Sequence, residues 1–482
     1  MAPEGRLFIN NEYVPSSSGQ TLTVINPADD TIVTDQVHTA SSTDVDHAVS
    51  CANEAFKSWK KTPSKQRAAT LLKFADILER HVDEIAKLES IAMGAPISLA
   101  RRVVTAQPPI WRYYAGLIGK LGGEMYPEEE EGYYRLVNYE PLGVCAGIAA
   151  WNGTQLFASW KIAPAVAAGN TVVFKSSEKS PLGVLYLGAL FKQAGFPPGV
   201  INLLSGAGEV GAQLASHMDI AKISFTGSTA VGRQIQIAAA KSNLKIVSLE
   251  LGGKSASLIF ADANLQNAVL HSSHGFLFNN AQVCTACSRI LVQEDIAPQF
   301  AEALKTAFTE VTSTIGDPAL ASTGLGPLAD RSQLERVVGF VERAKQQGIE
   351  VLVGGRRREG QPGQFMEPTI LVNPDTNSEV YTQEIFGPVA VIRTFKTEEE
   401  GITLANDTNY GLAGAISTSD VTRALRVASQ IEAGTVGVNS GPMLSTETPF
   451  GGWKQSGYGR ESGIHGLRGY LQTRSVMINM KA

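Results

Sequence analysis

Short apolar runs alternate with helical patterns from Val144 onward, and this alternation restricts the fold more than any other feature of the chain. Runs that are continuous in Val, Ile and Ala are typical of strands buried on both faces of a parallel sheet. Amphipathic helical patterns separate them, so helices would cover both faces. The first series of runs occupies 144–150, 171–175, 201–204, 221–226 and 245–250. The sequence therefore predicts a doubly wound α/β fold.

A second series of such runs begins near Ser255. Its members occupy 255–260, 288–292, 350–355, 388–395, 413–418 and 435–440, with helical patterns at 330–348 and 420–434. A chain of 482 residues with 43% hydrophobic content is too long for one ordinary core. We therefore expect two α/β domains that meet near residue 253.

The remaining segments carry different patterns. Residues 45–120 read as mostly helical. The acidic run 128–131 separates GGEMYP from the alternating YYRLVNYEP, which predicts the solvated turn of a protruding hairpin. The C-terminal LRGYLQTRSVMINM, 467–480, also alternates, and we expect a further strand there that could serve an oligomer interface.

Charge and cysteine content exclude several classes of protein. A net charge of -5 without a Lys/Arg block argues against nucleic acid or an anionic membrane as a partner. The N-terminus lacks the apolar core of a signal peptide, and no apolar run is long enough to cross a bilayer. Four cysteines are too few for a secreted disulfide scaffold. We therefore expect a cytoplasmic protein with free thiols.

Two glycine-rich segments resemble nucleotide-binding motifs. GAGEVG, 206–211, fits G-x-G-x-x-G after a predicted strand, but no acidic residue follows at the end of the next strand. It is either a pyrophosphate loop or an ordinary turn and helix start. GGKS, 252–255, is not a P-loop, because Ser248 stands where the first glycine is required.

Cys284 and Cys287 form a C-x-x-C pair. A structural zinc needs four ligands, and the nearest histidines, His271 and His274, lie upstream at helical spacing without a second cysteine pair. No metal is therefore expected. A redox pair, a packing role and a thiolate nucleophile with partners elsewhere in the chain stay open.

Eight sequence blocks together resemble the NAD(P)-dependent aldehyde dehydrogenase superfamily in order and spacing, over essentially the whole chain. They are AAWNG (149–153), FKSSEKSP (174–181), FTGSTAVG (225–232), LELGGKS (249–255), AQVCTAC (281–287), QEIFGPV (383–389), NYGLAG (409–414) and TPFGGWKQSGYGRE (448–461). The resemblance implies two Rossmann-like domains and a small β oligomerisation arm. The implied NAD-binding domain is 1–120 with 142–253, the catalytic domain 254–450, and the arm 121–141 with 466–482.

The resemblance also implies the catalytic residues. Cys284 falls at the position of the nucleophile, which adds to the aldehyde to give a thiohemiacetal. Asn152 and the backbone N–H of Cys284 would stabilise the oxyanion. Glu250 matches the general base that activates water to hydrolyse the thioester, whereas Cys287 is expected to be a small buried residue.

NAD is the cofactor that the resemblance implies. Glu178 would bind the adenosine ribose and repel a 2′-phosphate, while Lys175 leaves NADP as a weaker alternative. Gly227 and Ser228 open the helix that would face the pyrophosphate. The implied cofactor-binding residues are Trp151, Lys175, Ser177, Glu178, Gly227, Ser228, Gly232, Leu251, Glu384 and Phe386.

The implied substrate pocket carries no charge, which favours a neutral, bulky aldehyde, aromatic or of medium chain length. Its residues are Trp111, Gly153, Phe157, Trp160, Val283, Thr285, Leu444 and Phe450. The chain departs from the family at Gly153 and Thr154, at Ser176 and at Ala281, which alters loop rigidity and pocket shape. A semialdehyde substrate, transfer of the acyl group to coenzyme A, and a non-catalytic relative are the alternatives. The expected partners are a small aldehyde and copies of the same chain, in a homodimer or homotetramer.

Overall fold

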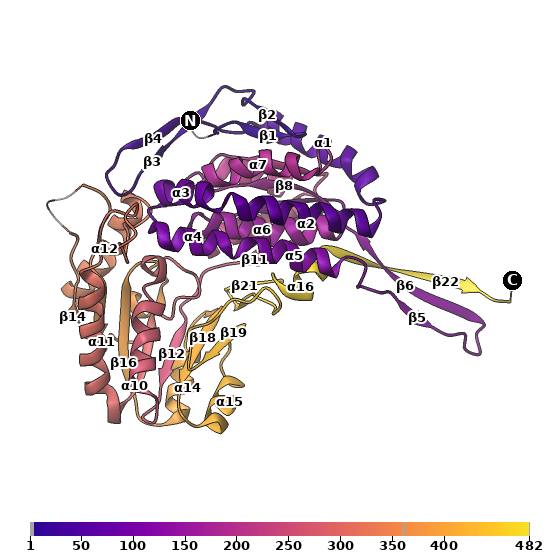
Figure 1. Cartoon of the computed structure of the whole chain (residues 1–482). Helices are drawn as coiled ribbons and strands as arrows, with labels where there is room; N and C mark the ends of the chain where they lie inside the picture. Colours follow the sequence, from indigo (N-terminus) through magenta and orange to yellow (C-terminus); the bar gives the residue numbers. More distant parts are fainter. Residues whose placement is uncertain (1–3, 359, 361, 482) are drawn as a thin grey trace.

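The computed structural model describes residues 4–358, 360 and 362–481, and contains two large sheets and a projecting arm (Figure 1). The first sheet has the order β2-β1-β9-β8-β7-β10-β11-β21. Its five central strands are parallel and coincide with the first predicted series: β7 (Val144–Ile148), β8 (Thr171–Lys175), β9 (Ile201–Leu204), β10 (Lys222–Thr226) and β11 (Ile246–Glu250). Four of them are buried at every residue, as their continuous apolar character predicts.

Helices cover both faces of this sheet. Those that connect its strands are α6 (Thr154–Ala167), α7 (Leu182–Ala194), α8 (Gly208–Ser216) and α9 (Thr229–Lys241). The predicted helical segment before Val144 forms α1 (Ser42–Trp59), α2 (Ser64–Arg80), α3 (Val82–Met93), α4 (Ile97–Thr105) and α5 (Gln107–Leu117). Because α5 and α2 pack over α6, all but one of the residues of α6 are buried. None of the described helices is long and apolar enough to span a membrane.

The second sheet has the order β14-β15-β16-β13-β12-β18-β19. Its strands are β12 (Ala256–Ile259), β13 (Arg289–Gln293), β14 (Glu350–Val353), β15 (Thr369–Val372), β16 (Val389–Phe395), β18 (Ala413–Ser417) and β19 (Thr435–Val438). Its helices are α10 (Leu265–Leu270), α11 (Ala297–Thr312), α12 (Arg331–Gln346), α13 (Glu379–Thr382), α14 (Glu398–Asn406) and α15 (Val421–Ala428). All six predicted strands are confirmed, while β15 was missed because its four residues, TILV, gave too short a signal.

Short strands join segments that are distant in sequence. β21 (Gly457–Tyr458) returns from the second half of the chain to pair with β11, and β20 (Trp453–Lys454) pairs with β17 (Tyr410–Gly411). At the opposite edge, β1 (Leu7–Ile9) and β2 (Glu12–Val14) extend the first sheet, and β3 (Thr21–Ile25) forms a hairpin with β4 (Ile32–His38). The segment that includes β21 therefore lies beside the end of β11.

The arm contains β5 (Glu124–Tyr126), β6 (Tyr133–Pro141) and β22 (Leu471–Asn479), and it projects away from the helices (Figure 1). β22 pairs antiparallel with β6 over the whole length of both strands, next to the short helix α16 (Gly463–Arg468). The predicted acidic hairpin turn and C-terminal strand are therefore confirmed. The division into domains stays a prediction, although the chain changes sheet between Glu250 and Ala256. Residues 1–3 of the predicted NAD-binding domain and residue 482 of the predicted arm lie outside the described residues.

Candidate active site

A cavity of about 630 Å³ lies at the carboxyl ends of the central strands of the first sheet. This edge is where open α/β sheets bind ligands, and loops from the second half of the chain close its other side. The predicted residues that line it are Trp151, Asn152, Phe157, Lys175, Glu178, Gly227, Ser228, Glu250, Leu251, Cys284, Glu384 and Phe386. The fold thus brings together side chains that are separated by more than 200 positions in the sequence.

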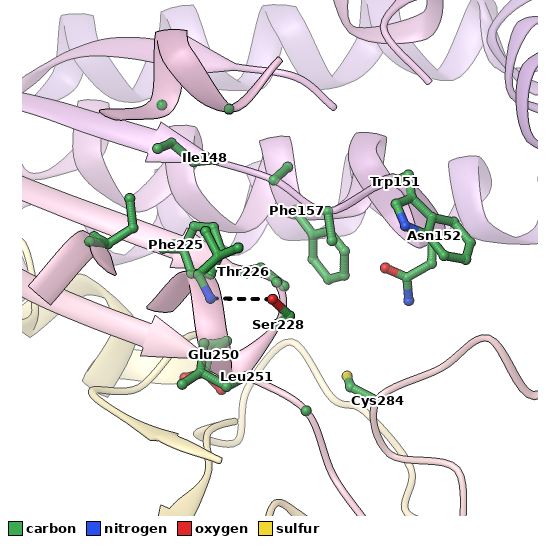
Figure 2. Close-up of a pocket in the computed structure, with 18 of the residues that line it drawn as sticks. Ile148, Trp151, Asn152, Phe157, Phe225, Thr226, Ser228, Glu250, Leu251 and Cys284 are labelled. Atoms are coloured by element: carbon green, nitrogen blue, oxygen red, sulfur yellow. Dashed lines mark hydrogen bonds between the residues drawn. The ribbon is translucent and has the colours of Figure 1, made fainter. Parts of the chain in front are cut away.

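Asn152 and Cys284 face the same space, with the side-chain amide and the thiol directed toward each other (Figure 2). Asn152 follows β7 in a short 3₁₀ turn, Trp151–Gly153, and its Nδ2 donates to the carbonyl oxygen of Gln282 at 2.9 Å. This bond ties the amide to the loop that carries the thiol. The amide is therefore held in place before any ligand binds.

The loop before Cys284 has an unusual backbone. Asn279, Asn280 and Ala281 have φ of 52°, 56° and 53°, in the left-handed region that favours glycine and asparagine. Alanine has neither the freedom of glycine nor the polar side chain of asparagine, so this conformation adds local strain at Ala281. The Nδ2 of Asn280 donates to the carbonyl oxygens of Gly326 and Pro327 and anchors the loop.

The thiol of Cys284 is neutral in this environment. Burial raises its pKa to about 12, and the negative charges of Glu384 and Glu250 act in the same direction. The thiolate is the reactive form of cysteine. Nucleophilic attack by Cys284 therefore requires a base or a nearby positive charge.

Glu250 ends β11 and is 3% exposed. Neither of its carboxyl oxygens has a hydrogen-bond partner among the described residues. Burial, together with the charge of Glu461, raises the pKa of Glu250 well above its ordinary value. A buried, unpaired carboxyl with a raised pKa is suited to exchange a proton with a ligand near neutral pH.

A buried ion pair lies beside Glu250. Lys161 of α6 pairs with Glu461, and its Nζ also donates to Thr226 Oγ1 at 2.7 Å. Glu461 follows β21, so the pairing of β21 with β11 brings its charge to this position. Sequence reasoning missed both members of the pair, because they are 300 positions apart.

Residues at the end of β8 and the start of α9 line the other end of the cavity. The Nζ of Lys175 is 3.8 Å from Oε2 of Glu178, and it donates to the carbonyl oxygen of Ser176 at 2.9 Å. Ser228 caps α9, because its Oγ accepts from the N–H of Val231 (Figure 2). Gly208 and Gly211 of α8 line the cavity opposite α9. The GAGEVG segment therefore borders the same space as GSTAVG, which its sequence alone left open.

The loop with Glu384 and Phe386 is held by α12. Arg336 donates to the carbonyl oxygens of Glu384 and Ile385, and Gln333 donates to that of Phe386. Both side chains also line the cavity, and sequence reasoning treated them only as part of a helical pattern. Burial raises the pKa of Glu384 to about 7, although its carboxylate accepts from the N–H of Gly253.

The aromatic rings of the predicted substrate pocket form a continuous group. The ring centres of Phe157 and Trp160 are 5.9 Å apart, and those of Trp160 and Phe450 are 5.4 Å apart. Cys284 packs against the apolar cluster that contains them.

Trp111 is 1% exposed and lies in the helical layer, where its Nε1 donates to Ser159 Oγ and its ring packs on Phe74. It is absent from the described lining of the large cavity, as are Gly153, Trp160, Val283, Thr285, Leu444 and Phe450.

Two predicted cofactor residues lie next to the cavity and not in its described lining. Gly232 packs under Leu251, where a Cβ atom would collide with the leucine side chain. Ser177 Oγ accepts from the N–H of Lys179 in the loop after β8. In the structure, Gly232 and Ser177 help to fix the backbone at this edge of the sheet.

Cys287 lies close to the backbone, with its Sγ 3.9 Å from the carbonyl oxygen of Thr285. Within residues 4–358, 360 and 362–481, no group of three or more His, Cys, Asp and Glu side chains could hold a metal ion. His271 accepts from the N–H of Gly441, in agreement with a polar helix residue.

Comparison with known proteins gives a consistent result. Residues 13–476 match the family described as "Aldehyde dehydrogenase family". The chain is 44% identical to an aldehyde dehydrogenase of Davidiella tassiana, over 98% of this chain and 95% of that protein. It is 43% identical to human retinal dehydrogenase 2, over 98% and 92% of the two chains.

Solved structures agree with these matches. The crystal structure of PnpE in complex with nicotinamide adenine dinucleotide is similar, with a TM-score of 0.96, 39% identity, and coverage of 99% of this chain and 98% of that one. An indole-3-acetaldehyde dehydrogenase of P. syringae, solved as a mutant with NAD+ and IAA, has a TM-score of 0.96 and 38% identity, over 99% and 97% of the two chains.

Proposed function

Because the chain belongs to the aldehyde dehydrogenase family, we propose that this oxidoreductase converts a neutral, bulky aldehyde to its carboxylic acid with NAD, through a thioester on Cys284 that water hydrolyses. One observation carries the proposal. A thiol, a fixed side-chain amide and a buried carboxyl without partners border a single cavity at the ligand-binding edge of the sheet.

The residues around the cavity fit a dinucleotide. Glu178 has a half-exposed carboxylate that can accept from ribose hydroxyls, and the N-terminus of α9 presents free backbone N–H groups suited to phosphate. The buried carboxyl of Glu384, which lines the same cavity, would bind a second ribose. NAD, when bound, accepts the hydride that leaves the substrate carbon.

The first chemical step is attack by Cys284. A base removes the proton from Sγ, and Glu250 is the unpaired carboxyl available for this at the cavity. The sulfur then bonds to the carbonyl carbon, and the amide of Asn152 and the N–H of Cys284 donate to the oxygen as it becomes negative. After the hydride has left, Cys284 carries a thioester.

Hydrolysis of the thioester completes the reaction. Once Glu250 has passed the Cys284 proton to solvent, it takes a proton from water, and the hydroxide adds to the thioester carbon. The C–S bond then breaks, and Glu250 returns its proton to the sulfur to release the acid and the Cys284 thiol. The buried pair of Lys161 and Glu461 lies next to Glu250 and tunes its charge. Acyl transfer to coenzyme A is disfavoured, because the carboxyl needed to activate water is present.

NAD is favoured over NADP by electrostatics. The carboxylate of Glu178 would repel a 2′-phosphate, and Lys175, which could attract one, already lies 3.8 Å from that carboxylate. Burial lowers the pKa of Lys175, which further weakens it as a phosphate-binding cation. NADP is therefore the weaker alternative.

The proposed substrate class rests on Phe157, Trp160 and Phe450, whose uncharged rings belong to the apolar cluster against which Cys284 packs. A semialdehyde with a distal carboxylate would require a cation there. Arg102 is one candidate that sequence reasoning missed, because its guanidinium lies 5.5 Å from the ring centre of Phe278 in the loop before Cys284. The comparison of kcat/KM for benzaldehyde, hexanal, acetaldehyde and succinate semialdehyde decides between these classes. A highest value for the semialdehyde would overturn the neutral preference.

We also propose a cytoplasmic homodimer or homotetramer. All four cysteines are free thiols, in keeping with a reducing compartment. The exposed three-stranded arm offers strand edges to a second copy of the chain.

The decisive experiment follows NADH formation with hexanal and NAD in the absence of coenzyme A, together with chromatography of the product. We expect stoichiometric NADH and free hexanoic acid. NADH without free acid would support acyl transfer instead, and no NADH with any aldehyde would support a non-catalytic role.

A further inference from the structure

A second, small cavity of about 30 Å³ lies next to Asn152. Asn152 lines both cavities. The remaining walls come from the end of α3, from α4, and from the segments around Gly153 and Phe278; they comprise Glu89, Met93, Ala95, Leu99, Ala100, Val103, Val104, Gly153, Gln155, Phe278 and Asn279. Most of this lining is apolar, with Glu89 and Gln155 at one end of it.

Glu89 and Gln155 are buried polar side chains that neighbour each other and leave polar atoms unsatisfied. Glu89 is 6% exposed and Gln155 is 1% exposed. Glu89 Oε1 and both amide atoms of Gln155 have no hydrogen-bond partner among the described residues. Buried polar atoms are normally satisfied, so such a group indicates a ligand or water that belongs to the site.

The two side chains lie together. A Cβ atom on Gly183 of α7 would collide with both Gln155 Nε2 and Glu89 Oε1, so the glycine leaves the room that they occupy. Burial raises the pKa of Glu89 to about 8, and the neighbouring Gln155 amide only partly offsets this. At neutral pH the carboxyl is therefore mainly protonated and can both donate and accept.

The chemistry at Cys284 sets the direction of the substrate chain. In the thiohemiacetal, the former carbonyl carbon has four substituents: the sulfur of Cys284, the oxygen beside Asn152, the hydrogen that leaves, and the rest of the aldehyde. The hydrogen must face the large cavity that fits the dinucleotide. The rest of the aldehyde must therefore leave on a third side, and Gly153, the residue after Asn152, lines the second cavity.

Gly153 opens this side. A Cβ atom at Gly153 would lie 3.4 Å from the ring of Phe157, so any larger side chain here would fill the space between Phe157 and the second cavity. The cavity itself has room for about two water-sized groups, since one water needs at least about 10–15 Å³. Its size thus suits the end of a chain and not a ring.

Resting on the proposed function, we propose that the second cavity receives the distal end of the aldehyde and that Gln155 and Glu89 bind an uncharged hydroxyl group there. A hydroxyl can donate to Gln155 Oε1 and accept from Gln155 Nε2 or from the Glu89 carboxyl. A carboxylate would be buried beside a carboxyl without a cation in the described lining. The substrate class is therefore an aldehyde with a distal hydroxyl.

The test compares straight-chain ω-hydroxyaldehydes with the unsubstituted aldehydes of the same length, in the full-length enzyme with NAD. We expect one chain length at which the ratio of kcat/KM, hydroxylated over unsubstituted, is highest. Gln155→Leu should lower that ratio about five- to tenfold, because a buried hydrogen bond to a neutral group is lost. Glu89→Gln, which keeps the shape and an acceptor, should lower it less.

Gln107→Leu is the matched control. Gln107 is also buried and has an unpartnered Nε2, but it lies outside the described lining of the second cavity. This variant should leave the ratio unchanged even if it lowers stability, and circular dichroism should show that each variant is folded. A ratio that Gln155→Leu and Glu89→Gln do not change would overturn the proposal and assign only water to the cavity. Failure of the proposed function has a different signature, since neither aldehyde would then produce NADH and free acid.

Discussion

Cys284 should react with a disulfide reagent much more slowly than an ordinary cysteine while the enzyme lacks its cofactor. Its pKa of about 12, against the ordinary 9.0, leaves about one thiol in 10,000 ionised at pH 8 instead of roughly one in ten. This lowers the rate about 900-fold. A thiolate of higher pKa is more nucleophilic. With a Brønsted coefficient of about 0.45, the rise in pKa from 9.0 to about 12 increases the rate constant of the thiolate about twentyfold. The net expectation is a reaction about fortyfold slower.

The assay measures the rate constant for dithiodipyridine between pH 7 and pH 10 in the Cys287→Ser variant, with mass spectrometry of peptides to assign the label. Because the pKa lies above this range, the rate should rise about tenfold per pH unit without a plateau. Limited access to the buried thiol lowers every rate by the same factor and leaves the slope unchanged. The double variant Cys284→Ser, Cys287→Ser supplies the background from Cys51 and Cys145. A plateau with a midpoint below pH 9 would refute the reasoning.

Further predictions concern individual residues of the site. Cys284→Ser should abolish aldehyde oxidation with NAD affinity nearly unchanged by fluorescence titration, whereas Cys287→Ser should keep most of the activity; the opposite result would exchange their roles. Glu250→Gln should lower steady-state turnover about 100-fold or more yet keep a stoichiometric burst of NADH in rapid-mixing experiments, and normal turnover would remove Glu250 from the mechanism. Glu178→Gln should raise kcat/KM for NADP relative to NAD about tenfold, because a repulsive charge is lost; an unchanged ratio would mean that Glu178 does not select the cofactor.

Much of the fold followed from local patterns. Most strands of both series were predictable because they are continuous apolar runs, and strands such as β7 and β12 that are buried at every residue favour this composition. β20 and β21 were not predictable, since strands of only two residues carry no periodic signal. The site residues in the eight blocks could be named from the resemblance, while Gln333 and Arg336 are part of an ordinary amphipathic helix and only their carbonyl partners give them a role.

The sequence by itself determined the doubly wound α/β class, the hairpin arm and the chemical groups of the site, because these depend on periodicity and on which residues are present. Only the tertiary structure decided the environment of those groups. The return of β21 to β11 brings Glu461 beside Glu250. Burial of the Cys284 thiol, together with the approach of Glu384 and Glu250, raises its pKa. Likewise, the packing of α3, α4 and α7 leaves polar atoms of Glu89 and Gln155 buried and unsatisfied. Burial and charge proximity depend on distances between segments far apart in the chain, and local sequence patterns do not contain those distances.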